Sequence, residues 1–136
     1  MAGYSKTPLA KKLGIKAGFS VKLVNAPEYY WGLFNDLPDD IRVNDNAIKL
    51  HDFIHFFTRD EKELTKVLPK LKNEMVQNGM IWVSWPKKSA KIACNITEQE
   101  VRETALRNGL VDIKVCAVDE VWSGLKLVIP VLSRKS

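Results

Sequence analysis

The 136-residue sequence is long enough for one domain with a real core, and its 46% hydrophobic and 27% charged residues are ordinary for a globular protein. Its formal net charge of +5 is lower than that of most dedicated nucleic-acid-binding domains. We see no signal peptide, no uncharged apolar run of about 18 residues and only two cysteines, so we expect a single cytoplasmic domain over residues 1–136, outside any membrane and without a disulfide framework.

The first half of the chain alternates between short helices and strands. A helix is expected at 5–14, begun by Ser5 or Thr7 and ended by Gly14. Apolar residues alternate through 19–24, which predicts a strand, and Pro27 then opens one or two helical turns over 28–34. Further strands are expected at 41–43 and at 53–57, where the unbroken apolar run indicates burial on both faces.

A longer helix should follow, because Thr58 and Glu61 have the spacing of a capping box. Apolar residues then recur at helical spacing up to Met75. Pro69 should kink or divide this helix, and Asn78-Gly79 should end it. The apolar run 80–85 is the strongest strand in the chain, and Pro86 ends it just before two lysines.

The last third predicts one helix and two strands. Thr97 and Glu100 form a second capping box, and this helix should end at Asn108-Gly109. Strands are expected at 110–118 and 125–131, joined by a turn at 122–124, so the two must pair antiparallel.

This order of elements predicts an α/β fold: a three-layer, Rossmann-like, mainly parallel sheet with a C-terminal antiparallel strand. The connection between residues 45 and 53 has no room for a crossover helix. Either residues 46–52 run back across the sheet without a helix, or the segment 41–43 is not a parallel strand.

The whole chain resembles a bacterial family known only as a domain of unknown function, and more distantly the class I S-adenosylmethionine-dependent methyltransferases. The segments that carry the first resemblance are 4–14, 25–27, 85–88 and 110–126. The second rests on the segments 13–24 and 68–83 and on the final antiparallel strand. Together they imply a methyltransferase-like fold without an activity.

The methyltransferase resemblance fails at the first strand. Those enzymes place a glycine-rich turn there, because the cofactor approaches the backbone closely, whereas this chain has Asn25-Ala26-Pro27. We expect no residue there to take positive φ. Asp45 stands where an acidic residue would hold ribose hydroxyls. S-adenosylmethionine is therefore a possible cofactor that we do not assume, and the cofactor stays unknown.

Ligands of open α/β sheets bind outside the carboxyl ends of the strands. This rule gathers a candidate binding site at one edge: Asn25, Pro27, Asp45, Thr58, Arg59, Trp85, Lys87, Lys88, Asp119 and Trp122. The lysines and the helix start at Thr58 would hold a phosphate or carboxylate, and Trp85 would form a planar wall. The alternative is that Trp85 fills the core and the lysines face water.

The segment His51-Asp52-Phe53-Ile54-His55 imitates a zinc-binding motif, but that motif requires a helix. Because the surrounding residues indicate a strand, we expect no metal site, and we expect His55 to be a core histidine with a hydrogen-bond partner.

The sequence favours a non-catalytic binding or regulatory domain that holds a small anionic or nucleotide-like ligand, or a protein partner, at that edge. The alternative is a divergent S-adenosylmethionine-dependent methyltransferase; no catalytic residue can be assigned. Nucleic-acid binding through the basic N-terminal segment is a third and less favoured hypothesis. Oligomeric state is not predicted.

Overall fold

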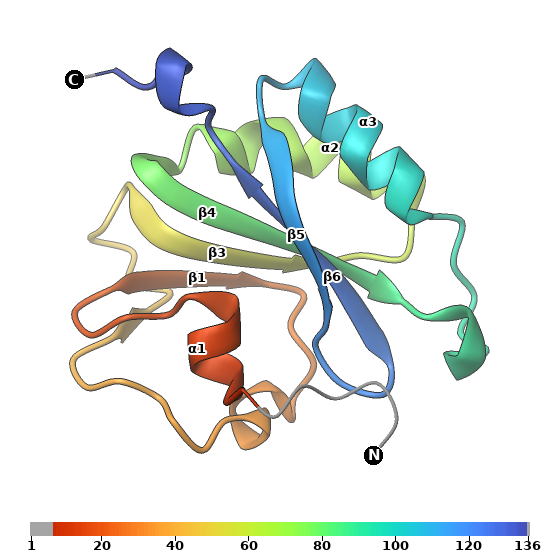
Figure 1. Cartoon of the computed structure of the whole chain (residues 1–136), viewed down its shortest axis with the longest axis horizontal. Coiled ribbons are helices and arrows are strands. Elements are labelled where there is room, and N and C mark those ends of the chain that lie inside the picture. Colours follow the sequence, from red (N-terminus) through yellow and green to blue (C-terminus); the bar gives the residue numbers. More distant parts are fainter. Residues whose placement is uncertain (1–6, 136) are drawn as a thin grey trace.

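The computed structural model describes residues 7–135 and contains a six-stranded sheet in the order β2-β1-β3-β4-β6-β5 (Figure 1). The strands are β1 (Ser20–Val24), β2 (Arg42–Val43), β3 (His51–Phe57), β4 (Met75–Pro86), β5 (Val111–Ala117) and β6 (Trp122–Val128). The helices are α1 (Leu9–Leu13), α2 (Glu61–Lys72) and α3 (Glu98–Arg107), with 3-10 turns η1 (Tyr30–Leu33), η2 (Lys88–Ala90) and η3 (Val131–Ser133).

The sheet is mainly parallel, as the sequence predicts. Strands β2, β1, β3 and β4 run parallel to one another, and β6 pairs antiparallel with both β4 and β5. The short strand β2 is parallel to β1, with Arg42 opposite Ser20. The connection from β2 to β3 contains no helix, so the first of the two expected paths is the correct one.

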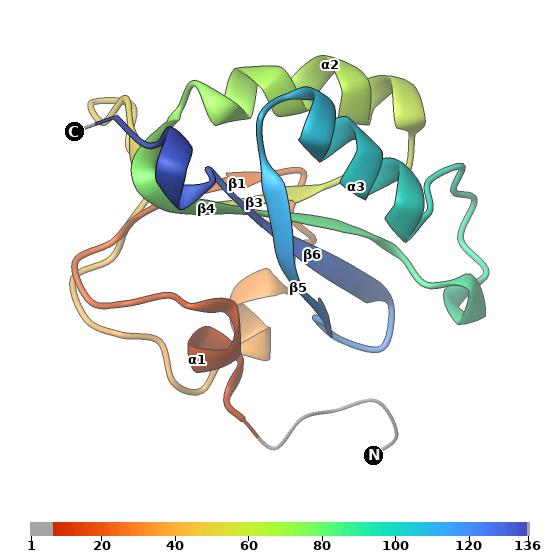
Figure 2. The same cartoon turned by 45° about the horizontal axis from the view of Figure 1, so that its top comes forward.

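The two faces of the sheet are covered unequally (Figure 2). Helices α2 and α3 both pack on one face, over a core that includes Phe56, Ile81 and Leu125. The other face carries α1 and the connection from β1 to β2, over Phe53 and Trp82. The fold therefore has three layers, and within residues 7–135 one outer layer consists of α1, the 3-10 turn η1 and loops.

Helix α1 is shorter than expected. Gly14 ends it with a φ of 92°, as predicted, while Pro8 rather than Ser5 or Thr7 is its N-cap; Ser5 lies outside the described residues. The helical turns predicted at 28–34 are the 3-10 turn η1.

Helix α2 begins and ends at different residues from those predicted. Its N-cap is Asp60, so Thr58 and Glu61 do not form a capping box, and Pro69 lies inside one continuous helix. The helix ends at Lys72, because the Glu74 amide donates to the Leu71 carbonyl and the chain turns directly into β4.

The predicted helix stop at Asn78-Gly79 is wrong, since both residues belong to β4. The register of β4 against β3 shifts between the pairs His51–Met75 and Phe53–Met80, so this segment forms an irregularity in the strand. A Cβ on Gly79 would lie 3.0 Å from the Asp52 carbonyl oxygen. Glycine is needed there for close approach of two strands.

The C-terminal elements follow the prediction except at the hairpin turn. Thr97 caps α3 by accepting a hydrogen bond from the Glu100 amide, and Gly109 follows the helix end with a φ of 73°. The predicted turn at 122–124 is wrong, because Trp122 already begins β6. Among residues 7–135, no helix is long and apolar enough to cross a membrane.

Candidate functional site

A cleft of about 430 Å³ opens at the carboxyl edge of the parallel strands, and we call it the edge cleft. It lies where β1 and β3 end, where α2 begins and where β6 starts. Its lining residues are Asn25, Phe57, Thr58, Arg59, Glu63, Ile92 and Trp122. Four residues of the predicted binding site therefore meet in one cavity: Asn25, Thr58, Arg59 and Trp122.

Asn25 shapes the turn after β1. Its φ is 58°, so the expectation that no residue in this turn takes positive φ is wrong. Asparagine tolerates the left-handed region better than most residues do. Its side-chain amide donates to the Phe57 carbonyl over 3.2 Å, which ties the end of β1 to the end of β3. Within residues 7–135 the Asn25 amide oxygen has no hydrogen-bond donor.

The aromatic wall of the edge cleft is Trp122, not Trp85. The Trp122 ring packs edge-on against Phe57, with ring centroids 5.0 Å apart. Its indole nitrogen donates to the Tyr29 hydroxyl over 3.1 Å, so the orientation of the ring is fixed from two sides. Trp85 is only 7% exposed and packs in the core beneath α2 and α3, which makes it unavailable to a ligand.

His55 lies directly behind this wall, stacked on Phe57 at 4.2 Å. The ring is fully buried, and its two nitrogens are bonded to the Tyr30 hydroxyl at 2.9 Å and to the Ser84 hydroxyl at 2.7 Å. Burial lowers the pKa of His55 to about 3 and raises the pKa of Tyr30. His55 is therefore a neutral core histidine with hydrogen-bond partners, as the sequence predicts.

Two charged side chains stand at the mouth of the edge cleft. Arg59 is exposed, and within residues 7–135 its guanidinium has no hydrogen bond or ion pair. Glu63 accepts a hydrogen bond from the Thr58 hydroxyl over 2.6 Å. The cleft thus offers the unpaired guanidinium of Arg59 next to the Glu63 carboxylate, which already accepts one hydrogen bond.

The start of α2 is not an anion site, contrary to the expectation from Thr58. The Glu61 amide donates to the Asn95 side chain over 2.7 Å, and Asn95 also donates to the Asp60 carboxylate. That side-chain hydrogen bond lowers the pKa of Asp60. The amides at the helix start already face the protein's own oxygens, and Glu61 and Glu63 add negative charge there.

The other predicted site residues lie outside the edge cleft. The Asp119 carboxylate accepts bonds from the Val121 and Trp122 amides at 2.8 and 2.7 Å, so it forms the hairpin turn. The Pro27 carbonyl accepts from the Tyr30 amide and begins η1. Lys87 and Lys88 follow β4 at the same edge without lining the edge cleft.

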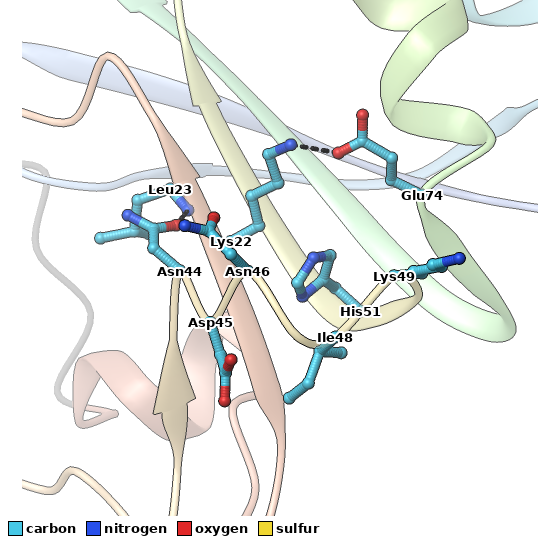
Figure 3. Close-up of a pocket in the computed structure, with 9 residues that line it drawn as sticks. All are labelled: Lys22, Leu23, Asn44, Asp45, Asn46, Ile48, Lys49, His51 and Glu74. Atoms are coloured by element: carbon cyan, nitrogen blue, oxygen red, sulfur yellow. Dashed lines mark hydrogen bonds and ion pairs between the residues drawn. The ribbon is translucent and has the colours of Figure 1, made fainter.

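Asp45 lines a different cavity, of about 340 Å³, along β1 (Figure 3). There Lys22 forms an ion pair with Glu74, and the His51 ring is bonded to the Ser20 hydroxyl at 2.7 Å. Burial, with Lys22 nearby, lowers the pKa of His51. Figure 3 shows the Asp45 carboxylate pointing away from the ion pair. This cavity shares no lining residue with the edge cleft.

The separation of the two cavities bears on whether the protein could hold S-adenosylmethionine. The turn after β1 and the acid after β2 are the two places where the resemblance would put the cofactor. Asn25 and Asp45 line separate cavities, and the turn that contains Asn25 has no glycine. The described residues therefore do not fit the cofactor in the way that the resemblance implies.

Solved structures of similar fold include methyltransferases. A S-adenosylmethionine-dependent methyltransferase from Aquifex aeolicus matches with a TM-score of 0.59 at 15% identity, covering 89% of this chain and 87% of that one. Aeropyrum pernix fibrillarin with bound S-adenosyl-L-methionine matches with a TM-score of 0.59 at 11% identity, covering 93% and 70%. A ribosomal protein L11 methylase from Lactobacillus delbrueckii subsp. bulgaricus matches with a TM-score of 0.55 at 12% identity, covering 94% and 75%.

At these identities the matches establish a Rossmann-like, methyltransferase-type fold and nothing about chemistry. No curated protein matches the sequence. One family model does match it, over residues 33–131. The chain therefore belongs to the family described as proteins of unknown function, DUF3052.

Proposed function

We propose that this chain is a non-catalytic binding domain that holds a small, nucleotide-like ligand with an anionic group in the edge cleft. The observation that carries the proposal is the meeting of an oriented tryptophan and an unpaired arginine in one cavity, Trp122 and Arg59. A flat aromatic face suits a base, and a guanidinium suits a phosphate or carboxylate.

The polar groups of the edge cleft support the same ligand class. The free amide oxygen of Asn25 and the Glu63 carboxylate are acceptors, which suit ribose hydroxyls or an exocyclic amine. Lys87 and Lys88 stand at the same edge of the sheet, where they add to the attraction of an anion.

The chemistry of the cleft favours binding over catalysis. Among the described residues that line it, none is a histidine, cysteine or lysine, and the one carboxylate, Glu63, already accepts a hydrogen bond from the Thr58 hydroxyl. The nearest histidine, His55, is fully buried behind Phe57 with both nitrogens bonded.

The test is calorimetric titration with adenine and guanine nucleotides, S-adenosyl compounds and sugar phosphates. We expect one nucleotide-like compound to bind stoichiometrically. Arg59→Gln should weaken binding about tenfold or more, because it removes one charged hydrogen bond to the anion. Lys66→Gln, on the exposed part of α2, is the matched control and should bind as the wild type does. If none of the nucleotides binds, or if Arg59→Gln binds like the control, the proposal is wrong.

A second candidate, a divergent S-adenosylmethionine-dependent methyltransferase, is favoured by the fold of the matched structures and by the left-handed turn at Asn25. Calorimetry decides between the two. Stoichiometric binding of S-adenosylmethionine, with S-adenosylhomocysteine competing and AMP not binding, would favour the methyltransferase.

A further inference from the structure

Four lysines from three separate parts of the chain come together beside α1, on the face of the sheet opposite α2 and α3. Lys12 and Lys16 belong to α1 and the segment after it, while Lys114 and Lys126 belong to β5 and β6. We call these four residues the lysine cluster. None of them lines the edge cleft.

Hydrogen bonds and strand register place Lys12, Lys114 and Lys126 next to one another, and Lys16 follows the end of α1 near Lys126. The Lys114 ammonium donates to the Lys12 carbonyl over 3.0 Å, and the Lys12 ammonium donates to the Ala117 carbonyl over 2.8 Å. Lys126 stands directly opposite Lys114 in the β5–β6 ladder. Its nitrogen also lies 3.7 Å from the position that a Cβ on Gly14 would take, at the end of α1.

The positive charge of the lysine cluster is not neutralised within residues 7–135. Ion pairs there involve Lys22 and Arg102, and none involves the four lysines. Asp112, two residues before Lys114, pairs with Arg102 of α3, on the other face of the sheet. Asp36 accepts bonds from the Ala10 and Lys11 amides, at the opposite end of α1 from Gly14.

The electrostatics agree with this arrangement. Burial, together with Lys114 and Lys16, lowers the pKa of Lys126. Burial raises the pKa of the neighbouring Cys116 thiol, although Lys12 and Lys114 act in the opposite direction.

Local structural roles explain only part of the cluster. Lys12 and Lys114 each bond one backbone carbonyl, which helps to hold α1 against the hairpin. An ammonium has three donors, so within residues 7–135 two donors remain on each. Like charges directly opposite each other in a sheet are destabilising, so the pair Lys114–Lys126 is costly for the isolated chain. A bound polyanion would neutralise the two ammonium groups, and the relief of their repulsion would add to the free energy of binding.

We propose that the lysine cluster binds the phosphodiester backbone of nucleic acid. Closely spaced phosphates match a group of lysines drawn from one helix and one hairpin, and lysine recognises phosphate as a point charge without reading sequence. The sequence did not favour this partner, because Lys114 and Lys126 join the basic N-terminal segment only in the folded chain.

The experiment is fluorescence anisotropy with a labelled single-stranded oligothymidylate over a range of salt concentrations. If all four lysines neutralise phosphates, log K should fall with log salt with a slope of about −2.8, which is roughly a 50-fold loss of affinity between 50 and 200 mM salt. The double variant Lys114→Gln/Lys126→Gln should reduce the slope to about −1.4 and weaken binding about tenfold or more at low salt.

Three controls make the outcome decisive. The double variant Lys66→Gln/Lys70→Gln removes the same charge from exposed positions of α2 and should keep the wild-type slope. Lys114→Arg/Lys126→Arg keeps the charge and should also keep the slope. Thermal unfolding of Lys114→Gln/Lys126→Gln should show a midpoint equal to or above that of the wild type, so that lost binding is not lost folding.

The proposal is overturned by any of three results. The first is that the wild type does not bind the oligonucleotide at low salt. The second is that Lys66→Gln/Lys70→Gln weakens binding as much as Lys114→Gln/Lys126→Gln does. The third is that poly-glutamate binds as tightly as the oligonucleotide at equal charge concentration. The last result would mean that the cluster selects negative charge in general rather than phosphate.

Discussion

His51 and His55 show why a spacing means different things in different elements. In a helix, residues four apart share one face at close range, whereas in β3 the same spacing separates them by about 13 Å along the strand. The two rings accordingly reach different partners, Ser20 for His51 and Tyr30 with Ser84 for His55. Within residues 7–135 no cluster of three metal-binding side chains is present.

The buried His55 should make stability depend on pH. Burial lowers its pKa in the folded protein to about 3, from an ordinary value of 6.5, so the unfolded chain binds a proton more readily. The stabilisation is fully present above pH 6.5 and is lost as pH falls from there towards 3. The loss from this group should be about 1.4 kcal/mol per pH unit. Urea unfolding from pH 7 to pH 4 measures it.

The matched variant is His55→Gln, which keeps a polar side chain but cannot titrate in this range. It should be less stable than the wild type at pH 7 and should show a flatter dependence of unfolding free energy on pH. Equal slopes in the two proteins would mean that another group carries the effect.

At the scale of elements, the β5–β6 hairpin controls the position of Trp122 in the edge cleft. Asp119, only 8% exposed, holds the turn through the Val121 and Trp122 amides. We expect Asp119→Ala to lower the free energy of unfolding by about 1–3 kcal/mol, because both amides lose their acceptor. Chemical denaturation measures this change.

Asp119→Asn is the control, since its amide oxygen can still accept a hydrogen bond. It should recover most of the lost stability, and intrinsic tryptophan fluorescence should report a wild-type environment for Trp122. If Asp119→Asn is as unstable as Asp119→Ala, the negative charge rather than the turn geometry is what matters.

The sequence predicts most elements but misplaces some of their ends. Alternation and unbroken apolar runs locate β1, β3 and the core of β4, because burial of side chains determines those strands. The helix end predicted at Asn78-Gly79 is wrong, because asparagine followed by glycine suits a helix end and a strand irregularity equally well. The turn predicted at 122–124 is wrong, because Gly124 is needed inside β6. A Cβ on Gly124 would lie 3.1 Å from the Trp82 ring.

The candidate site was only partly predictable for a related reason. The rule that ligands bind at carboxyl strand ends selected Asn25, Thr58, Arg59 and Trp122, and these four line one cavity. It does not say on which side of the sheet a side chain lies, so Trp85 could not be separated from Trp122. Phe57, Glu63 and Ile92 were not predicted as site residues. Glu63 and Ile92 come from α2 and from the loop before α3 rather than from strand ends, and Phe57, the last residue of β3, was assigned to the buried strand.

At the scale of the whole molecule, the repulsion within the lysine cluster that would favour binding of a polyanion should also lower the free energy of unfolding. Removing one member of the opposed pair with Lys126→Gln should raise the free energy of unfolding by about 0.2–1 kcal/mol at low salt. Added salt should reduce the difference between variant and wild type, because it screens the repulsion. Guanidinium is itself a salt, so urea denaturation at several NaCl concentrations is the suitable measurement. A variant that is less stable at every salt concentration would contradict this prediction.

The strands of the sheet should differ in how readily they open locally in the native state, since β2 is joined to β3 without a helix. β4 lies between two strands, and its residues 81–85 are buried, whereas both residues of β2 are exposed at the sheet margin. Amide hydrogens of β4 should therefore exchange with deuterium only when the whole chain unfolds, while those of Arg42 and Asn44 should exchange through small local openings. Exchange followed residue by residue by NMR would then show protection rising steadily from β2 through β1 and β3 to β4.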